Sequence, residues 1–364
     1  MRLSFMTYLP IAVLCLAACS APAWSQSTVA LYGVADAGLV RESGGAGGGH
    51  ARVASGIASA SRIGLRGSES LGAGMSAIFT LEGGVRLDTG EADSAGLLFN
   101  RQAYAGIKSG YGTLTVGRQY TPYHTTLTGV ADPFGTGLAG TAKNLFPDSG
   151  NNVRTNNTVL YAMPGAHGWS GEVAFSLGEQ ASSKAGRQWG AAAGYASGKL
   201  NLRLAWNSKN GDTAAAPGVP PVRRGNGRNT LFAANYDAGP FKAYLAYGAD
   251  KGFNSAPLGN AGNPYGGVRP VASLHGDEIL LGFSAPAGNG TLVGSLMRKN
   301  DKTALDQDAS AWGVGYLYPL SRRSTAYGAY ARVANRRGAG YTVGNNADPG
   351  AGNRAFNLGL RHTF

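Results

Sequence analysis

The chain has 364 residues, of which 58 are glycine, 43% are hydrophobic and 14% are charged, and its formal net charge is +12. This much glycine excludes a mainly helical soluble protein, because each glycine inside a helix costs up to about 1 kcal/mol relative to alanine. The hydrophobic share excludes an intrinsically disordered chain. The length then leaves two soluble domains or one large β domain.

The first residues have the pattern of a secretory signal. Arg2 provides a positive start, residues 9–18 are apolar, and small residues precede Ser25. The apolar stretch is too short to span a bilayer, which takes about 20 residues, but it has the length of a signal-peptide core. We therefore predict a signal peptide of residues 1–25, cleaved after Ser25, and a single domain of residues 26–364.

Both cysteines, Cys15 and Cys19, lie in this predicted signal. Cleavage after Ser25 leaves a chain without thiols, which excludes disulfides and cysteine-ligated metal sites. Residues 16–19 have the sequence Leu-Ala-Ala-Cys, which is also the pattern of a lipoprotein signal. Lipidation of Cys19 is therefore the alternative to cleavage after Ser25.

The rest of the chain contains repeated stretches in which apolar and polar residues alternate. In one stretch, Leu200, Leu202 and Leu204 share one face. Asn201 and Arg203 share the opposite face. Alternation with a period of two predicts β-strands whose two faces meet different environments. Similar stretches lie at 241–248, 324–333 and 356–364.

Two architectures are consistent with such strands. A soluble sandwich buries its apolar faces, whereas a membrane barrel turns them towards lipid and encloses water with its polar faces. The secretory signal favours the barrel. Aromatic residues near the ends of segments, such as Trp169 and Tyr316, also favour it, because such residues form girdles at the membrane interfaces.

Tight turns and longer polar connections alternate along the chain. Turns rich in Gly, Pro, Ser and Asn are predicted at 68–74, 109–112, 164–168, 196–199, 238–240, 286–290 and 319–322. Longer connections are predicted at 41–59, 88–96, 120–153, 179–187, 209–228, 252–276, 300–308 and 334–354. Seven turns and eight loops predict sixteen strands. The expected fold is therefore all-β, a 16-stranded antiparallel transmembrane β-barrel wide enough for an aqueous channel, with both termini on the periplasmic side.

Four sequence stretches carry a resemblance to a known family. They are STVALYGVADAG (27–38), SRIGLRGSESLGAGMSAIFTLEGG (61–84), FNRQAYAGIKSGYGTLTVGRQY (99–120) and the terminal NLGLRHTF. Together they resemble the general porins of Gram-negative outer membranes, especially the β-proteobacterial type. The resemblance implies a homotrimer whose third external loop folds into the lumen of each barrel. It also implies passive diffusion of small hydrophilic solutes and ions, not catalysis.

The resemblance extends to assembly and to membrane partners. The final Phe364 resembles the signal by which the outer-membrane assembly machinery recognises its substrates. The basic run at 223–228 is expected on an external loop, where it would meet solvent or lipopolysaccharide phosphates and outer-membrane lipids. We therefore expect no nucleic-acid partner, although a basic run alone is also typical of nucleic-acid binding.

Strand parity places charged residues on the face towards the lumen. Ile63 and Leu65 face lipid, so Arg62 and Arg66 face the lumen. By the same alternation, Glu82 faces the lumen from the next strand.

The resemblance adds three further site residues. It implies that Arg101 and Arg154 point into the lumen. In the family, the third external loop often carries an acid in a Pro-Glu-Phe-Gly motif. Here the 120–153 connection has Asp132 before Pro133, Phe134 and Gly135, so the order of the motif differs.

These residues predict an anion-preferring pore constriction. Four arginines, Arg62, Arg66, Arg101 and Arg154, would face only Glu82 and Asp132. Rings of arginine select anions, and a guanidinium stays charged at any relevant pH. Small anions and hydrophilic solutes are therefore the expected cargo.

Two other functions remain open from the sequence. A substrate-specific anion channel would also use arginines in its lumen, and an outer-membrane barrel enzyme would need a catalytic group that the chain does not display clearly. No two histidines are at metal-ligand spacing, and no phosphate-binding motif follows a strand. We therefore expect no enzyme activity, no cofactor and no metal.

Overall fold

The computed structural model describes residues 27–180, 184–256 and 273–364. The predicted signal peptide, with its cleavage or lipidation site, lies outside the described residues. The strands are β1 (Thr28–Gly45), β2 (Gly48–Ser55), β3 (Arg62–Gly72), β4 (Met75–Gly84), β5 (Gln102–Ser109), β6 (Gly112–Tyr120), β7 (Arg154–Ala162), β8 (Trp169–Ser176), β9 (Gln188–Ser197), β10 (Leu200–Asn210), β11 (Asn226–Asp237), β12 (Lys242–Lys251), β13 (His275–Ala287), β14 (Gly290–Asp301), β15 (Ala309–Pro319), β16 (Ser324–Asn335) and β17 (Arg354–Thr363).

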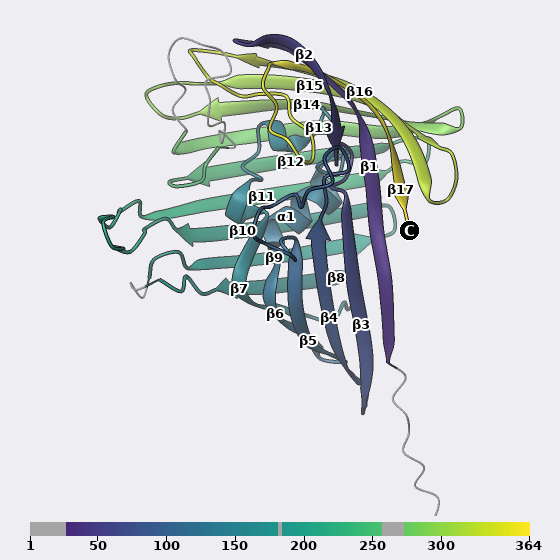
Figure 1. The fold of residues 1–364 in the computed structure, drawn as a ribbon, viewed down its shortest axis with the longest axis vertical. Coiled ribbons are helices and arrows are strands. Elements are labelled where there is room, and N and C mark those ends of the chain that lie inside the picture. Colours follow the sequence, from purple (N-terminus) through teal and green to yellow (C-terminus); the bar gives the residue numbers. More distant parts are fainter. Residues whose placement is uncertain (1–26, 181–183, 257–272) are drawn as a thin grey trace, which may run out of the picture.

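Within these residues the strands form one closed antiparallel sheet (Figure 1). Closure occurs where β1 pairs with β17, so that Val34 lies opposite Thr363 and Ser43 lies opposite Arg354. On its other side β1 pairs first with β3 and then with β2, which therefore occupy one position in the wall. The predicted 16-stranded antiparallel barrel is confirmed, with one of its sixteen positions divided between two strands.

The predicted long loop at 41–59 is wrong, because most of these residues belong to β1 and β2. The chain continues as β1 to Gly45 and returns as β2 from Gly48, so the first long connection is a tight hairpin followed by a break at 56–61. The break is organised by the buried carboxylate of Asp36, which accepts the backbone N–H groups of Ile57 and Ser59, each at 3.0 Å.

Alternate side chains along the strands have opposite exposure. Leu204 and Leu281 are each 52% exposed, whereas the adjacent Ala205 and Leu280 are buried, at 1% and 0%. An exposed apolar face is the reverse of what a soluble sheet presents to water, and it is the pattern of a lipid-facing barrel wall.

The longest described connection without strands runs from 121 to 153 and is called here the 121–153 segment. It contains α1 (Pro122–Thr126) and the short turns η1 (Leu127–Ala131), η2 (Ala142–Asn144) and η3 (Gly150–Asn152). Thr121 caps α1 by accepting the backbone N–H of His124, and Pro122 occupies the first turn, where its missing N–H costs nothing. No helix among the described residues is long and apolar enough to cross a membrane.

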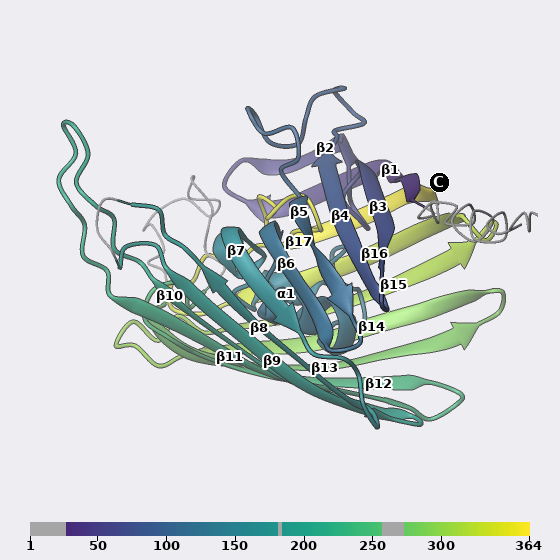
Figure 2. The same ribbon diagram turned by 90° about the horizontal axis from the view of Figure 1, so that it is seen from below.

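The 121–153 segment packs against β8 to β12 (Figure 2). Tyr123, Leu127 and Phe146 of the segment are fully buried. They belong to a cluster with buried wall residues such as Leu231 and Leu280. Burial of each such side chain contributes about 1.5–3 kcal/mol, so apolar contact holds the segment on the buried face of the wall.

Candidate functional site

A cavity of about 770 Å³ lies beside the 121–153 segment. Its walls come from the break between β2 and β3, the residues after β4, the 121–153 segment and the loop between β16 and β17. Its cationic lining residues are Arg52, Arg62, Arg86, Arg101, Lys143 and Arg154, and its acidic ones are Asp88, Asp93 and Asp348. The cavity is therefore lined by twice as many fixed positive charges as acids, before His124 is considered.

Glu82 does not itself line the cavity, but its carboxylate contacts two arginines that do, Arg62 and Arg101. Its carboxylate is 3% exposed and accepts Nε of Arg101 at 2.8 Å. Its second oxygen lies 3.4 Å from Nε of Arg62 and accepts the hydroxyl of Tyr32 at 3.0 Å. The buried carboxylate thus orients the Arg101 guanidinium through a charge-assisted hydrogen bond, which is directional and strong, and forms an ion pair with that of Arg62.

Tyr120 lies between Arg101 and Arg154. Its phenol oxygen accepts Nη2 of Arg101 at 2.7 Å and Nη2 of Arg154 at 2.8 Å. The Arg154 guanidinium carbon also lies 4.4 Å from the centre of the Tyr120 ring, a cation–π contact. The wall from β3 to β7 therefore carries one continuous chain of polar contacts, formed by Arg62, Glu82, Arg101, Tyr120 and Arg154.

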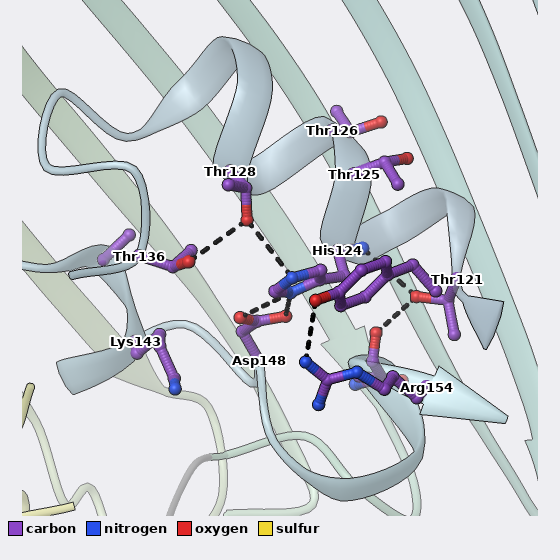
Figure 3. Close-up of polar contacts among 12 residues, drawn as sticks. Thr121, His124, Thr125, Thr126, Thr128, Thr136, Lys143, Asp148 and Arg154 are labelled. Atoms are coloured by element: carbon purple, nitrogen blue, oxygen red, sulfur yellow. Dashed lines mark hydrogen bonds and ion pairs between the residues drawn. The ribbon is translucent and has the colours of Figure 1, made fainter. Parts of the chain in front are cut away.

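The 121–153 segment supplies the next polar side chains of the cavity (Figure 3). His124 stacks on Tyr120 with ring centres 4.8 Å apart, and its Nδ1 lies 2.9 Å from the buried carboxylate of Asp148. Lys143 donates to the backbone oxygen of Asn346 at 2.8 Å, which ties the segment to the loop before β17. Desolvation lowers the pKa of Lys143.

The structure brings together four of the six site residues predicted from the sequence: Arg62, Arg101, Arg154 and Glu82. Arg66 lies apart from them. Its guanidinium carbon is 5.2 Å from the ring centre of Tyr32, and it does not line the cavity. Arg66 is two inward positions along β3 from Arg62, towards the tight turn, so it belongs to a different depth of the wall.

The placement of Asp132 differs from the expectation that it faces the arginines. Its carboxylate is 4% exposed and accepts the backbone N–H groups of Phe134, Thr136 and Ala142, each at 2.9 Å, and the Thr141 hydroxyl at 3.1 Å. These donors all belong to its own segment, so Asp132 folds the segment and does not line the cavity. Burial raises the pKa of Asp132 to about 6, although the four donors act in the opposite direction.

Asp348, in the loop between β16 and β17, is one of the three acids that do line the cavity. It accepts Nη2 of Arg52 at 2.8 Å, and Arg52 also contacts the buried Glu42 at 3.1 Å. Sequence reasoning did not find Asp348, Tyr120, His124 or Lys143 as site residues. Asp348 lies in an irregular loop, and His124 and Lys143 lie in the single turns α1 and η2, where no longer periodicity marks the direction of a side chain.

The predicted assembly residue lies at the seam of the barrel. Phe364 exchanges backbone hydrogen bonds with Gly33, at 3.0 and 3.2 Å, and its side chain is 48% exposed. The aromatic ring occupies the place that a side chain at position 33 would need, so glycine is required there. The described residues contain no group of three or more His, Cys, Asp or Glu side chains that could hold a metal ion.

A model of the family described as Gram-negative porin matches residues 12–338. The chain belongs to the Gram-negative porin family. This porin is 31% identical to an outer membrane porin protein of Bordetella pertussis over 305 residues, which cover 76% of this chain and 78% of that protein. It is 27% identical to outer membrane porin protein 32 of Delftia acidovorans over 367 residues, with 95% and 97% covered.

Solved porin structures have the same fold. The anion-selective porin from Comamonas acidovorans superposes with a TM-score of 0.74 at 25% identity, covering 93% of this porin and all of that chain. OmpT of Vibrio cholerae in its trimer form superposes with a TM-score of 0.64 at 17% identity, which shows a shared fold alone. This chain is therefore an outer-membrane porin channel, and its family indicates a channel and not an enzyme.

Proposed function

We propose that this porin is an anion-preferring diffusion channel for small hydrophilic solutes. The observation that carries the proposal is the lining of the cavity, where six Arg and Lys side chains face three Asp side chains. Fixed positive charge raises the local concentration of anions and repels cations within about a Debye length, which is about 8–10 Å near physiological salt. A relative of similar fold is an anion-selective porin, which supports the same preference.

We further propose that the 121–153 segment lies inside the lumen and sets the narrowest part of the pathway. Two polar contacts to wall strands support this. Asn235 of β11 donates to the backbone oxygen of Val130 at 2.9 Å, and Ser295 of β14 donates to that of Gly140 at 2.7 Å. These wall side chains are buried and alternate with exposed apolar ones, so they extend from the face opposite to lipid.

The decisive measurement is the reversal potential of the purified channel in a KCl gradient across a planar bilayer. The wild-type channel should show a potential of the sign that chloride preference produces. The double variant Arg62→Ser/Arg101→Ser should move the potential towards zero or reverse its sign, because it removes two positive charges from the cavity wall. Arg223→Ser serves as the control, since Arg223 lies on an external loop with its side chain 79% exposed. A cation-selective wild type, or a double variant that keeps the parental potential, would overturn the proposal.

Our proposal for processing and assembly is the one that membership of the porin family suggests. We propose that residues 1–25 are removed, that residues 26–364 form the barrel domain, and that three copies associate in the outer membrane, as the trimer form of a structural relative suggests. Light scattering in mild detergent tests the trimer, and a monomer alone would contradict it.

We propose that Phe364 is read by the outer-membrane assembly machinery, and that the exposed basic run at 223–228 meets lipopolysaccharide phosphates. Phe364→Ser should lower the amount of inserted porin without lowering synthesis. Normal outer-membrane levels of this variant would contradict that role.

A further inference from the structure

Tyr120 occupies an unusual place among the charges of the cavity. It is the last residue of β6 and lies directly opposite Arg154, the first residue of β7, in the antiparallel register. The 121–153 segment leaves the wall immediately after Tyr120 and returns to it just before Arg154. The pair therefore forms the stem of the segment, where the position of a side chain is set by a strand ladder and not by a loop.

The hydrogen bonds at the phenol oxygen leave one donor unused. A phenol has two lone pairs and one proton, and guanidinium groups donate but cannot accept. Arg101 and Arg154 each donate to this oxygen, at 2.7 and 2.8 Å, so together they occupy both lone pairs. In the part of the chain that the structure describes, no protein acceptor for the phenol proton lies within hydrogen-bond distance.

The surroundings fix the direction of this side chain. His124 stacks on the ring, and Asp148 holds the imidazole from the other end of the segment. Arg101 is held in turn by Glu82. Tyr120, Arg101 and Arg154 all line the cavity, so the unused O–H donor and the remaining N–H donors of the two guanidinium groups converge on space that solutes enter.

We propose that Tyr120 positions Arg101 and Arg154 and makes the cavity discriminate among anions, favouring small carboxylates over halide ions. A carboxylate has two oxygens with about four lone-pair directions, so it can accept from both guanidinium groups and from the phenol at once. A chloride ion is a single sphere and gains nothing from the spacing of the donors. The proposal rests on the proposed function, because it concerns the order among anions in a channel that prefers anions.

The test compares potassium acetate with potassium chloride in planar bilayers containing the full-length channel. Wild-type conductance should saturate at lower acetate than chloride concentration, and added acetate should reduce the chloride current. Tyr120→Phe keeps the ring, its stacking and the net charge but removes the hydroxyl. Its half-saturating acetate concentration should rise about tenfold, as expected for the loss of one hydrogen-bonding group.

Tyr104→Phe is the matched control. Tyr104 is also a strand tyrosine, and its hydroxyl accepts the Thr80 hydroxyl at 3.1 Å. Among the residues that the structure describes, it has no arginine partner. This variant should keep the acetate saturation of the wild type.

Two failures are distinguishable. A wild-type channel that prefers cations contradicts the proposed function. If the wild type is anion-selective but acetate does not reduce its chloride current, the proposed role of Tyr120 is wrong. The same holds if Tyr120→Phe has the wild-type acetate saturation. Neither result contradicts the anion preference itself. The effect of acetate on the chloride current is measured on the wild type alone. The proposal can therefore be tested even if Tyr120→Phe inserts poorly into the membrane.

Discussion

Among the described residues, two clusters of paired charges differ in their access to water. One is the cavity cluster of Arg62, Glu82, Arg101, Tyr120 and Arg154 described above. The other, called here the sealed cluster, consists of Lys299 of β14, Asp250 of β12 and Glu278 of β13, whose side chains are all 0% exposed.

The two clusters use their donors differently. Nζ of Lys299 donates to Asp250 at 2.9 Å, to Glu278 at 2.7 Å and to the backbone oxygen of Ser255 at 2.8 Å. These three bonds use every proton of the ammonium group, so none is left for a solute. In the cavity cluster, by contrast, cations outnumber acids and keep donors beside open space. The two clusters therefore differ in whether their donors remain available to water and solutes.

The sealed cluster has a mechanical role instead. Asp250 accepts from Asn229 at 2.8 Å, and Asn229 accepts from Asn152 of the 121–153 segment at 3.0 Å. A buried polar chain thus connects four wall strands, β11 to β14, to the end of the segment. These bonds attach the end of the segment to the wall.

The largest expected effect comes from removing the cation of the sealed cluster. Lys299→Met leaves two buried carboxylates without a counter-ion and should lower the free energy of unfolding by about 3–5 kcal/mol. The measurement is the denaturant midpoint of the channel folded into lipid vesicles. Lys302→Met is the control, because Lys302 pairs with Asp277 near the surface with its side chain 40% exposed, and such pairs contribute about 0–1 kcal/mol. Equal midpoints for the two variants would show that the sealed cluster contributes no more than a surface pair.

The next prediction compares the reversal potentials of two arginine variants, at positions on the same face of the wall. Arg154→Ser should shift the reversal potential towards zero, because Arg154 lines the cavity, whereas Arg66→Ser should shift it less, because Arg66 does not. Both variants should keep the free energy of unfolding within about 1 kcal/mol of the wild-type value, since neither leaves a fully buried charge without its partner. A larger shift from Arg66→Ser would move the selective region towards the tight-turn end of the barrel.

Salt concentration should affect the charges of the cavity cluster more than those of the sealed cluster. Raising KCl from about 0.1 M to about 1 M shortens the Debye length from about 10 Å to about 3 Å, so anion preference should fall. The loss of stability in Lys299→Met should change little over the same range, because water and ions do not reach that group. A preference that is independent of salt would place the selective charges in a site that ions do not screen.

The smallest expected effect concerns Asp132, a buried carboxylate held by neutral donors and not by a cation. Its pKa of about 6 lies above the ordinary value of about 3.9. The stabilisation from this shift is therefore complete below about pH 4 and is lost as the pH rises through about 6. The denaturant midpoint of the wild type should fall between pH 4.5 and pH 7.5 more than that of Asp132→Asn. Parallel pH profiles would mean that Asp132 does not titrate in this range.

Much of the fold was predictable from the sequence because the two faces of each strand meet opposite solvents. Leu200, Leu202 and Leu204 mark such a face clearly, and the sixteen wall positions are confirmed. The prediction was wrong at 41–59, where glycine-rich residues form the end of β1 and the start of β2. Those residues pair through backbone groups and lack the bulky alternation that marks the other strands.

The candidate site was predictable where parity holds and not where it breaks. Ile63 and Leu65 place Arg62 correctly, because β3 pairs with β4 without irregularity at that point. The register of β6 shifts between Gly117 and Gln119, and Gly117 has a φ of +136°. Alternation counted from earlier residues of β6 therefore could not place Tyr120.

The acid in the 121–153 segment shows a second limit. A loop sequence does not tell whether a carboxylate points into open space or towards its own backbone. The turn that follows Asp132 directs the N–H groups of Phe134 and Thr136 at it, and the start of η2 adds that of Ala142. That geometry depends on packing of the segment against the wall. Only the folded wall supplies this information.

The seam between β1 and β17 joins the two ends of the chain, so the barrel closes only when its first and last strands meet. The entropy lost in closing a ring grows only with the logarithm of its length, and each doubling of length costs about 0.6 kcal/mol more. A few residues added to an external loop therefore change the free energy of closure by a small fraction of a kcal/mol. The loop between β10 and β11, whose hairpin ends at the Ala216–Val219 bridge, is consequently a place where a labelling peptide can be inserted without opening the ring.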